Sequence, residues 1–330
     1  MSQNTQNELG KTLWNIANQL RGAMMADDFR DYMLSFLFWK YLSDNYVRAA
    51  KNELGSDYPE TPKDIMEKLG VTTPLQIWYN ENEKDIFLFE KQMRRKVHYV
   101  IDPQYLWDNI VALAKTQDDQ LLKTIEKGFK YIENDSFESS FKGLFSEINL
   151  NSDKLGKDYT ERNKLLSIVI STIADGLKDY SPEKDSLGDA YEYLMTMYAS
   201  NAGKSGGEFF TPADVSELLT RLGTVGKTTI NKVYDPACGS GSLLLKAEKI
   251  LGKDAVISGF FGQEINITTY NLCRINMHLH DIGYDKFDIA CEDTLVSPQH
   301  WDDEPFEVIV SNPPYSIKWA SDDNPDVAPT

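Results

Sequence analysis

The sequence predicts an α/β protein in two parts: a mostly helical N-terminal domain over residues 1–180 and a Rossmann-like domain with a parallel sheet over residues 181–330. In the first part, apolar residues recur every three or four positions, which is the spacing of amphipathic helices. In the second part, short strand-like runs alternate with helical patterns, and strands separated by helices pair in parallel. The polar, proline-containing segment 179–185 predicts the boundary between the parts.

Helical spacing in the first part predicts helices over 7–21, 28–45, 105–115, 119–131 and 160–177. The segment 28–45 carries a broad stripe of aromatic and aliphatic residues. Such a stripe is typical of a buried core, and a subunit interface is the alternative. Turn-forming residues at 55–62 and 70–74 predict breaks between helices.

The second part predicts a repeating order of helices and strands. Helices are expected over 187–199, 213–222, 242–251 and 267–280, and strands over 232–236, 257–263, 287–291 and 306–310. In a doubly wound sheet, ligands bind beyond the carboxyl ends of the strands. The motifs described below all fall at such ends.

The charge balance is strongly acidic, with a formal net charge of −17 and a pI near 4.7. Proteins that hold nucleic acid unaided usually present a basic face, because neutralisation of phosphates supplies most of the nonspecific affinity. The longest basic cluster, residues 91–96, is short and predicts one solvated face of a helix. The alternative is that this cluster begins a local basic cleft. If the substrate is DNA, we expect a partner protein to supply most of the DNA-binding contacts.

The cysteines and the N-terminus indicate an intracellular setting. The three cysteines, Cys238, Cys273 and Cys291, have no CxxC spacing, which argues against zinc or a disulfide framework and for a reducing compartment. The first residues are polar and lack the features of a secretory signal. The most apolar run, 33–39, is far shorter than the ~20 residues of a membrane span. We therefore expect a cytoplasmic protein without metal or membrane contacts.

The first motif is the turn of residues 235–242, Asp-Pro-Ala-Cys-Gly-Ser-Gly-Ser, between a strand and a helix. Gly239 and Gly241 allow the backbone to approach a ligand closely, and the start of a helix follows. The turn departs from the dinucleotide fingerprint because Leu244 stands at the position of its third glycine. A sulfonium nucleoside such as S-adenosyl-L-methionine has no pyrophosphate and fits this departure. Asp235 is positioned to hold the ammonium group of its amino-acid part, directly or through water.

Acidic residues end the next two predicted strands. Glu264 lies about twenty residues beyond the glycines, where a carboxylate accepts both ribose hydroxyls. Asp293 ends the third strand and is a candidate acceptor for the adenine amino group, and Glu292 is the alternative.

The second motif, Ser311-Asn-Pro-Pro-Tyr315, ends the last predicted strand. Pro313 and Pro314 have no N–H groups, so the loop presents acceptors. The Asn312 side-chain oxygen and the Pro313 carbonyl are each expected to take one hydrogen of a planar NH2 group. Tyr315 offers a ring on which a planar base stacks. Together the two motifs predict methyl transfer from S-adenosyl-L-methionine to an exocyclic or amide nitrogen.

At these motifs the sequence resembles the modification (methyltransferase) subunits of type I restriction-modification systems. The likeness covers about residues 186–320 strongly and the helical part in layout. Its matching segments are residues 207–212 (Gly-Glu-Phe-Phe-Thr-Pro), 235–242, 262–264 (Gly-Gln-Glu) and 311–315. The resemblance places Asn312, Pro313, Pro314 and Tyr315 at the target base. For the cofactor it implies Glu208, Phe209, Phe210, Thr211, Pro212, Ser240, Gly241, Ser242 and Glu264.

The resemblance implies N6-adenine methylation of double-stranded DNA in a complex. A specificity (S) subunit would read the sequence, a restriction (R) subunit would cleave, and a second copy of the modification (M) subunit is expected. Such subunits continue past the Asn-Pro-Pro-Tyr motif with further strands. The sequence predicts only four of the expected seven strands, so the domain over 181–330 is expected to be incomplete at its C-terminus.

Two alternatives remain. Protein-glutamine N5-methyltransferases also combine a helical N-terminal domain with an Asn-Pro-Pro-Tyr loop, because a glutamine amide is likewise a planar NH2. The Phe-Thr-Pro segment upstream of the glycine turn favours the nucleic-acid enzyme. A non-catalytic assembly subunit is the other alternative, and the intact Asn312 and Glu264 argue against it.

Overall fold

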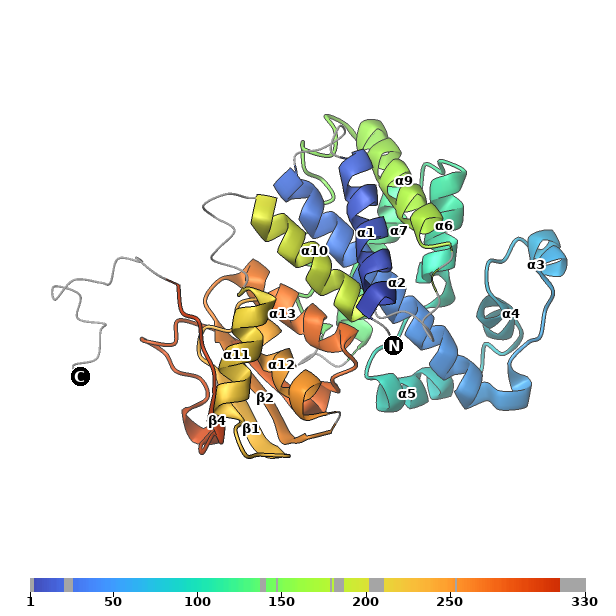
Figure 1. Ribbon diagram of the computed structural model, residues 1–330. Coiled ribbons are helices and arrows are strands. Elements are labelled where there is room, and N and C mark those ends of the chain that lie inside the picture. Colours follow the sequence, from blue (N-terminus) through green and yellow to red (C-terminus); the bar gives the residue numbers. More distant parts are fainter. Residues whose placement is uncertain are drawn as a thin grey trace. The chain divides into compact units, whose positions relative to one another are not determined.

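The computed structural model describes residues 3–20, 26–136, 141–146, 148–178, 180, 187–201, 211–252 and 254–314. The chain divides into two compact units, Met1–Leu187 and Gly188–Thr330 (Figure 1). The first is helical and the second contains the sheet, which confirms the predicted fold class. No helix in the described ranges is both long enough and apolar enough to cross a membrane.

The N-terminal unit consists of helices joined by short turns. Its α-helices are α1 Gln3–Leu20, α2 Ala26–Leu54, α3 Lys63–Leu69, α4 Pro74–Glu81, α5 Ile86–Val97, α6 Trp107–Lys115, α7 Leu121–Asp135 and α9 Tyr159–Gly176. The five predicted helices are confirmed, although α2 continues nine residues beyond the predicted end at residue 45. The short helices α3 and α4 were not predicted, because they carry too few turns to produce a clear periodicity. Of α5, only the helix face of residues 91–96 was predicted.

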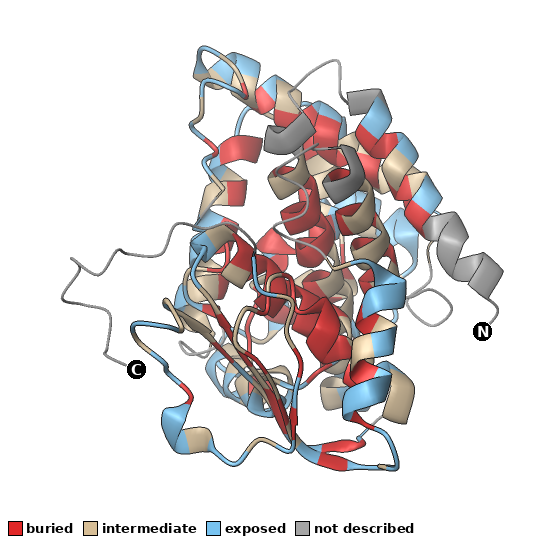
Figure 2. Ribbon diagram, turned by 60° about the vertical axis from the view of Figure 1, so that its left-hand side comes forward, coloured by how far each residue is buried: buried red, intermediate tan, exposed pale blue. Residues whose placement is uncertain are grey.

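The aromatic stripe of α2 lies in the core of this unit. Met33, Phe36 and Trp39 are buried, and the Trp39 indole donates a 2.9 Å hydrogen bond to the Tyr105 carbonyl. On α7, Gly128 lies so close to Trp39 that an added Cβ would come within 2.7 Å of the ring. Figure 2 shows these buried stretches in red along the helices. The prediction that the stripe is core is confirmed.

The basic cluster of residues 91–96 lies on α5. Arg94 contacts Glu90 at 3.6 Å, and Lys96 forms an ion pair with Glu53. Lys91 and Arg95 are exposed to solvent. The cluster is therefore one solvated face of a helix, partly neutralised by acidic neighbours, as predicted.

The C-terminal unit is built on a parallel sheet with the strand order β3-β2-β1-β4. Its helices are α10 Leu187–Asn201, α11 Ala213–Gly223, α12 Ser242–Leu251 and α13 Ile267–Leu279, and its strands are β1 Ile230–Asp235, β2 Val256–Glu264, β3 Phe287–Cys291 and β4 Val308–Ile309. The predicted elements are confirmed within one or two residues, except that β4 is shorter than the predicted 306–310. Its register with β1 is regular only at Val308 and Ile309.

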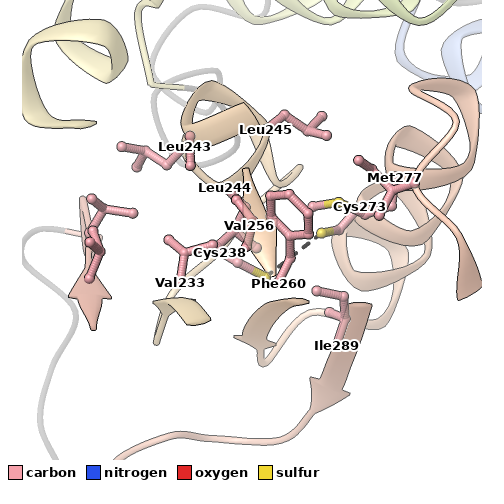
Figure 3. Close-up of a cluster of buried hydrophobic side chains, with 14 of the residues drawn as sticks. Val233, Cys238, Leu243, Leu244, Leu245, Val256, Phe260, Cys273, Met277 and Ile289 are labelled. Atoms are coloured by element: carbon pink, nitrogen blue, oxygen red, sulfur yellow. Dashed lines mark hydrogen bonds between the residues drawn. The ribbon is translucent and has the colours of Figure 1, made fainter. Parts of the chain in front are cut away.

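One face of this sheet forms the core with α11, α12 and α13. Val233, Phe260, Ile289 and Val308 project from the four strands into a cluster that includes buried side chains of α12 and α13 (Figure 3). On α11, Gly223 lies against Val308, where an added Cβ would come within 3.1 Å. The opposite face carries Tyr234 and Phe261, whose rings contact His300 and Phe306.

Helix α10 is joined to the rest of this unit by polar contacts. The Lys249 ammonium on α12 lies 2.8 Å from Asp189 and 2.6 Å from Glu192 of α10. Tyr191 donates to the Leu272 carbonyl on α13 at 3.5 Å. Helices α12 and α13 are thus supported by a helix that precedes them in the chain.

Candidate active site

The turn of residues 235–242 leaves β1 with two glycines in the left-handed conformation. Gly239 has φ 53° and Gly241 has φ 80°. A Cβ on Gly241 would come within 2.8 Å of both Cys273 Sγ and Met277 Cε. Any larger residue would therefore be strained in its backbone and would also collide with α13. The sequence therefore needs glycine here for packing and for the left-handed backbone.

Neighbouring elements hold this turn by its backbone. The Cys238 N–H donates to the Gln263 carbonyl at 3.0 Å, and the Gly239 N–H donates to Glu264 Oε2 at 3.1 Å. On the other side, the Asn276 side chain on α13 donates to the Ser240 carbonyl at 2.9 Å. The end of β2 and the helix α13 therefore fix the geometry of the turn.

The Glu264 carboxylate lies at the end of β2 beside the turn. Its second oxygen, Oε1, accepts the Asn266 N–H at 2.8 Å. Each carboxylate oxygen thus accepts one backbone N–H and retains a further lone pair. The side chain is held in place by these bonds and is half-buried at the edge of the sheet.

Asp235 is enclosed at the end of β1. Its Oδ1 accepts the Ala237 N–H at 3.0 Å, whereas Oδ2 and the nearby Ser311 hydroxyl make no standard hydrogen bond with any described atom. Burial raises the pKa of Asp235 to about 7, against the lowering effects of the Ala237 N–H and Ser311. The charge of Glu264 raises this pKa further. The predicted role of Asp235 at the cofactor ammonium stays a prediction, because the carboxylate is fully buried.

The loop after β3 lies beside the turn and carries Asp293. Asp293 Oδ1 accepts the Leu295 N–H at 2.9 Å, and the Thr294 hydroxyl donates to the Pro236 carbonyl at 2.5 Å. Asp293 is half-buried and Glu292 is exposed. The structure thus brings Asp293, the turn and Glu264 to adjacent strand ends.

Two exposed apolar side chains follow these acids, and the sequence analysis missed both. Ile265 follows Glu264 and is 64% exposed, and Leu295 lies two residues after Asp293 and is also 64% exposed. Both side chains therefore lie on the surface beside the two acids. The available signal was an aliphatic residue one or two positions after an acid at a predicted strand end.

The segments around Thr211 and Asn312 meet, although 101 residues separate them in the chain. The Asn312 side-chain amide donates to the Thr211 hydroxyl at 3.2 Å. The hydroxyl of the buried Ser216 on α11 donates a hydrogen bond to the Thr211 carbonyl at 3.3 Å. Three predicted residues beside them are exposed: Pro212, Pro313 and Pro314. The predicted residues Glu208, Phe209, Phe210 and Tyr315 lie outside the described ranges.

The Cys238 thiol in the turn is not activated as a nucleophile. The Cys238 and Cys273 sulfur atoms lie 3.9 Å apart in the core (Figure 3). The Cys273 thiol and burial raise the pKa of Cys238 well above its ordinary value. A nucleophilic thiolate, which methylation at cytosine C5 requires, is therefore not expected at this site.

Ligand-type side chains gather at two other places in the described part of the unit. Asp189 and Glu192 lie near His280, and the Lys249 ammonium bonds to both carboxylates. His300 lies near Asp288 and Asp303, and its two ring nitrogens contact Asp303 and the Gly262 carbonyl.

Comparison with known proteins places the chain in a family. Residues 9–173 match the model of the HsdM N-terminal domain, and residues 182–328 match that of the N-6 DNA methylases. The chain belongs to the family of type I restriction-modification methylase subunits. The resemblance inferred from the sequence is thereby confirmed.

Individual relatives agree with this family. The chain is 40% identical to the type I restriction enzyme MpnII methylase subunit of Mycoplasma pneumoniae, over 96% of this chain and 59% of that protein. It is 26% identical to the MjaVII methylase subunit of Methanocaldococcus jannaschii, over 89% of this chain and 46% of that protein. The crystal structure of a type I methyltransferase subunit from Streptococcus thermophilus is 31% identical, with a TM-score of 0.82, over 96% of this chain and 64% of that one. The chain therefore spans about half to two thirds of the length of these methylase subunits.

Proposed function

We propose that the protein transfers the methyl group of S-adenosyl-L-methionine to the N6 amino group of adenine in double-stranded DNA. It would act as the modification subunit of a type I complex, with a specificity subunit, a restriction subunit and a second copy of itself. The match to the N-6 DNA methylases supports this choice of substrate.

One observation carries the proposal: the motifs converge at the carboxyl ends of neighbouring strands. Gly239, after β1, bonds to Glu264 at the end of β2 at 3.1 Å. Asn312 follows β4, the neighbour of β1 on its other side, and bonds to Thr211. A cofactor site and a target site placed at adjacent strand ends suit direct transfer between two bound groups.

The strand-end acids suggest how the cofactor would lie. Glu264 would accept the ribose hydroxyls with the lone pairs that its two backbone bonds leave. The adenine ring would lie between Ile265 and Leu295, and Asp293 would accept its amino group. Asp293 suits this role better than Glu292, because its own turn hydrogen bond with Leu295 fixes its side chain. The methionine part would lie along residues 239–242 and 208–212, near Asp235.

The chemistry needs positioning of the amino group more than acid–base groups. Asn312 Oδ1 and the Pro313 carbonyl would accept the two N6 hydrogens and concentrate the nitrogen lone pair. That nitrogen would then attack the methyl carbon in line. The new N–C bond would form as the C–S bond breaks, with the electron pair of the C–S bond returning to sulfur and an N6 proton released to water. Tyr315 would stack on the adenine, which must be extruded from the duplex at a cost of a few kcal/mol.

The alternatives have less support. A protein-glutamine N5-methyltransferase would not account for the match of residues 9–173 to the HsdM N-terminal domain. A non-catalytic subunit would not require the contact between Asn312 and Thr211.

The substitution Asn312→Ala tests the division of roles. Turnover should fall by at least about 100-fold, because the contact to the amino group matters in the transition state. Affinity for S-adenosyl-L-methionine should stay within a few-fold. Transfer of radiolabelled methyl to DNA and calorimetry of cofactor binding measure the two effects. Equal losses in both would place the loop at the cofactor and contradict the proposal.

A further inference from the structure

Gln263 connects the two sides of the proposed cofactor pocket. It is the penultimate residue of β2, and its side chain is fully buried. Its backbone carbonyl accepts the Cys238 N–H of the glycine turn at 3.0 Å. Its side chain points to the loop of residues 292–299, which carries Asp293 and Leu295.

The side-chain amide makes three hydrogen bonds to that loop. Nε2 donates to the Glu292 carbonyl at 3.1 Å and to the Ser297 carbonyl at 2.9 Å. Oε1 accepts the Gln299 N–H at 3.1 Å. Both donor hydrogens and the acceptor oxygen are used, and the bonds lie on both sides of Asp293.

We infer that Gln263 is a positioning residue that sets the distance between the glycine turn and the adenine-binding loop. The inference rests on the proposed function, because it takes Asp293 as the acceptor for the adenine amino group. Internal bonds give the loop its shape: the Leu295 N–H bonds to Asp293 Oδ1 at 2.9 Å, and the Ser297 N–H bonds to the Asp293 carbonyl at 2.8 Å. Those bonds do not fix where the loop lies relative to the turn. Gln263 does so by bonds within the loop, together with the contact from Thr294 to Pro236. The pairing of Cys291 with Glu264 and the bond from His300 to the Gly262 carbonyl hold the two ends of the loop.

The residue type follows from this task. Two carbonyls and one N–H of the loop point to the end of the Gln263 side chain. A neutral amide matches them because it both donates and accepts hydrogen bonds. A carboxylate would face two carbonyls without a hydrogen to donate, and an aliphatic side chain would leave all three groups without this partner. The contact between Thr294 and Pro236 remains in either case. Loss of Gln263 should therefore loosen the loop and leave the fold intact.

The test compares two ligands that differ only at the group that Asp293 would bind. S-adenosylhomocysteine carries the adenine amino group, and its purine-riboside analogue carries a hydrogen in its place. Calorimetry gives the affinity of each for the wild type, Gln263→Met, Asp293→Asn and the double variant. Asn163→Leu is the matched control, because Asn163 is also a buried amide that bonds to two backbone groups, Leu122 N–H and Asp118 C=O, in the other unit.

The wild type should prefer the adenine ligand, and Gln263→Met should lose most of that preference, with a loss of about tenfold in affinity for S-adenosylhomocysteine. The double variant should show no smaller preference for the adenine ligand than Asp293→Asn alone shows, because both changes remove the same contact. Asn163→Leu should lower the melting temperature and leave the preference unchanged. If Gln263→Met does not fold, Gln263→Asn, which keeps the amide but shortens its reach, is measured with the same ligands.

A variant at Gln263 that weakens both ligands by the same factor, or neither, would overturn the inference and leave the proposed function standing. A wild type that binds neither ligand would overturn both. The two failures are therefore distinguishable in one set of titrations.

Discussion

Among single residues, Glu264 is the side chain that we propose holds the ribose of the cofactor. Its two oxygens are already oriented by the N–H groups of Gly239 and Asn266. A ribose would therefore meet a preorganised carboxylate. The same two bonds mean that Glu264 shapes the turn as well as the ligand contact.

The substitution Glu264→Gln keeps the size of the side chain and removes its charge. A hydrogen bond to a charged group contributes about 1.5–3 kcal/mol, so we expect affinity for S-adenosyl-L-methionine to fall by roughly 10- to 100-fold. Calorimetry measures this, with circular dichroism as the check on folding. Unchanged affinity in a folded variant would remove Glu264 from the ribose site.

Asp235 predicts a pH dependence of stability. Its pKa rises from 3.8 to about 7 on folding, so the folded protein holds a proton there that the unfolded chain releases above pH 4. This contribution to stability is full below pH 4 and is lost as the pH rises through about 7. The Asp235→Asn variant has no charge to bury. As the pH rises from 5 to 8, its melting temperature should therefore increase relative to that of the wild type. A constant difference across this range would show that Asp235 is ionised in the folded protein.

At the scale of elements, the packing of the turn against α13 sets the geometry of the site. An alanine at position 241 would combine a left-handed backbone with a collision against Cys273 and Met277. We expect Gly241→Ala to cost about 1–3 kcal/mol for the backbone and a similar amount for the overpacking, and to abolish cofactor binding. Gly70→Ala is the control, because Gly70 is also left-handed, with φ 66° and ψ 28°, but has nothing within 4 Å of its added Cβ. Chemical denaturation compares the two, and equal losses would contradict the role of the collision.

Most elements of the second unit could be predicted from the sequence because its strands are apolar runs between clear turns. The Asp-Pro-Ala-Cys-Gly-Ser-Gly-Ser turn and the acid at residue 264 were recognisable because their chemistry depends on residue type and spacing. The contacts from Gln263 to Ser297 and from Asn312 to Thr211 were not, because side-chain bonds between distant segments leave no periodic trace. Helix α3 was missed for a different reason, since seven residues give less than two full turns of pattern.

At the scale of the whole molecule, the net charge of −17 limits what the chain does with DNA by itself. The longest basic cluster is a partly neutralised face of α5, which is a weak footprint for a polyanion. The relatives in this family are named as methylase subunits of type I restriction enzymes. Sequence-specific methylation should therefore need the specificity subunit, and the methylase should supply the chemistry.

We propose that the reaction transfers a methyl group to the N6 nitrogen of adenine. The most direct measurement incubates DNA with deuterated-methyl S-adenosyl-L-methionine and the protein, with and without the specificity subunit, and identifies the modified nucleoside by mass spectrometry. We predict labelled N6-methyl-2′-deoxyadenosine from the DNA only when the specificity subunit is present and only when Asn312 is intact. Label in N4-methylcytosine, in a protein glutamine, or in DNA treated with the Asn312→Ala variant at the wild-type rate would contradict the account.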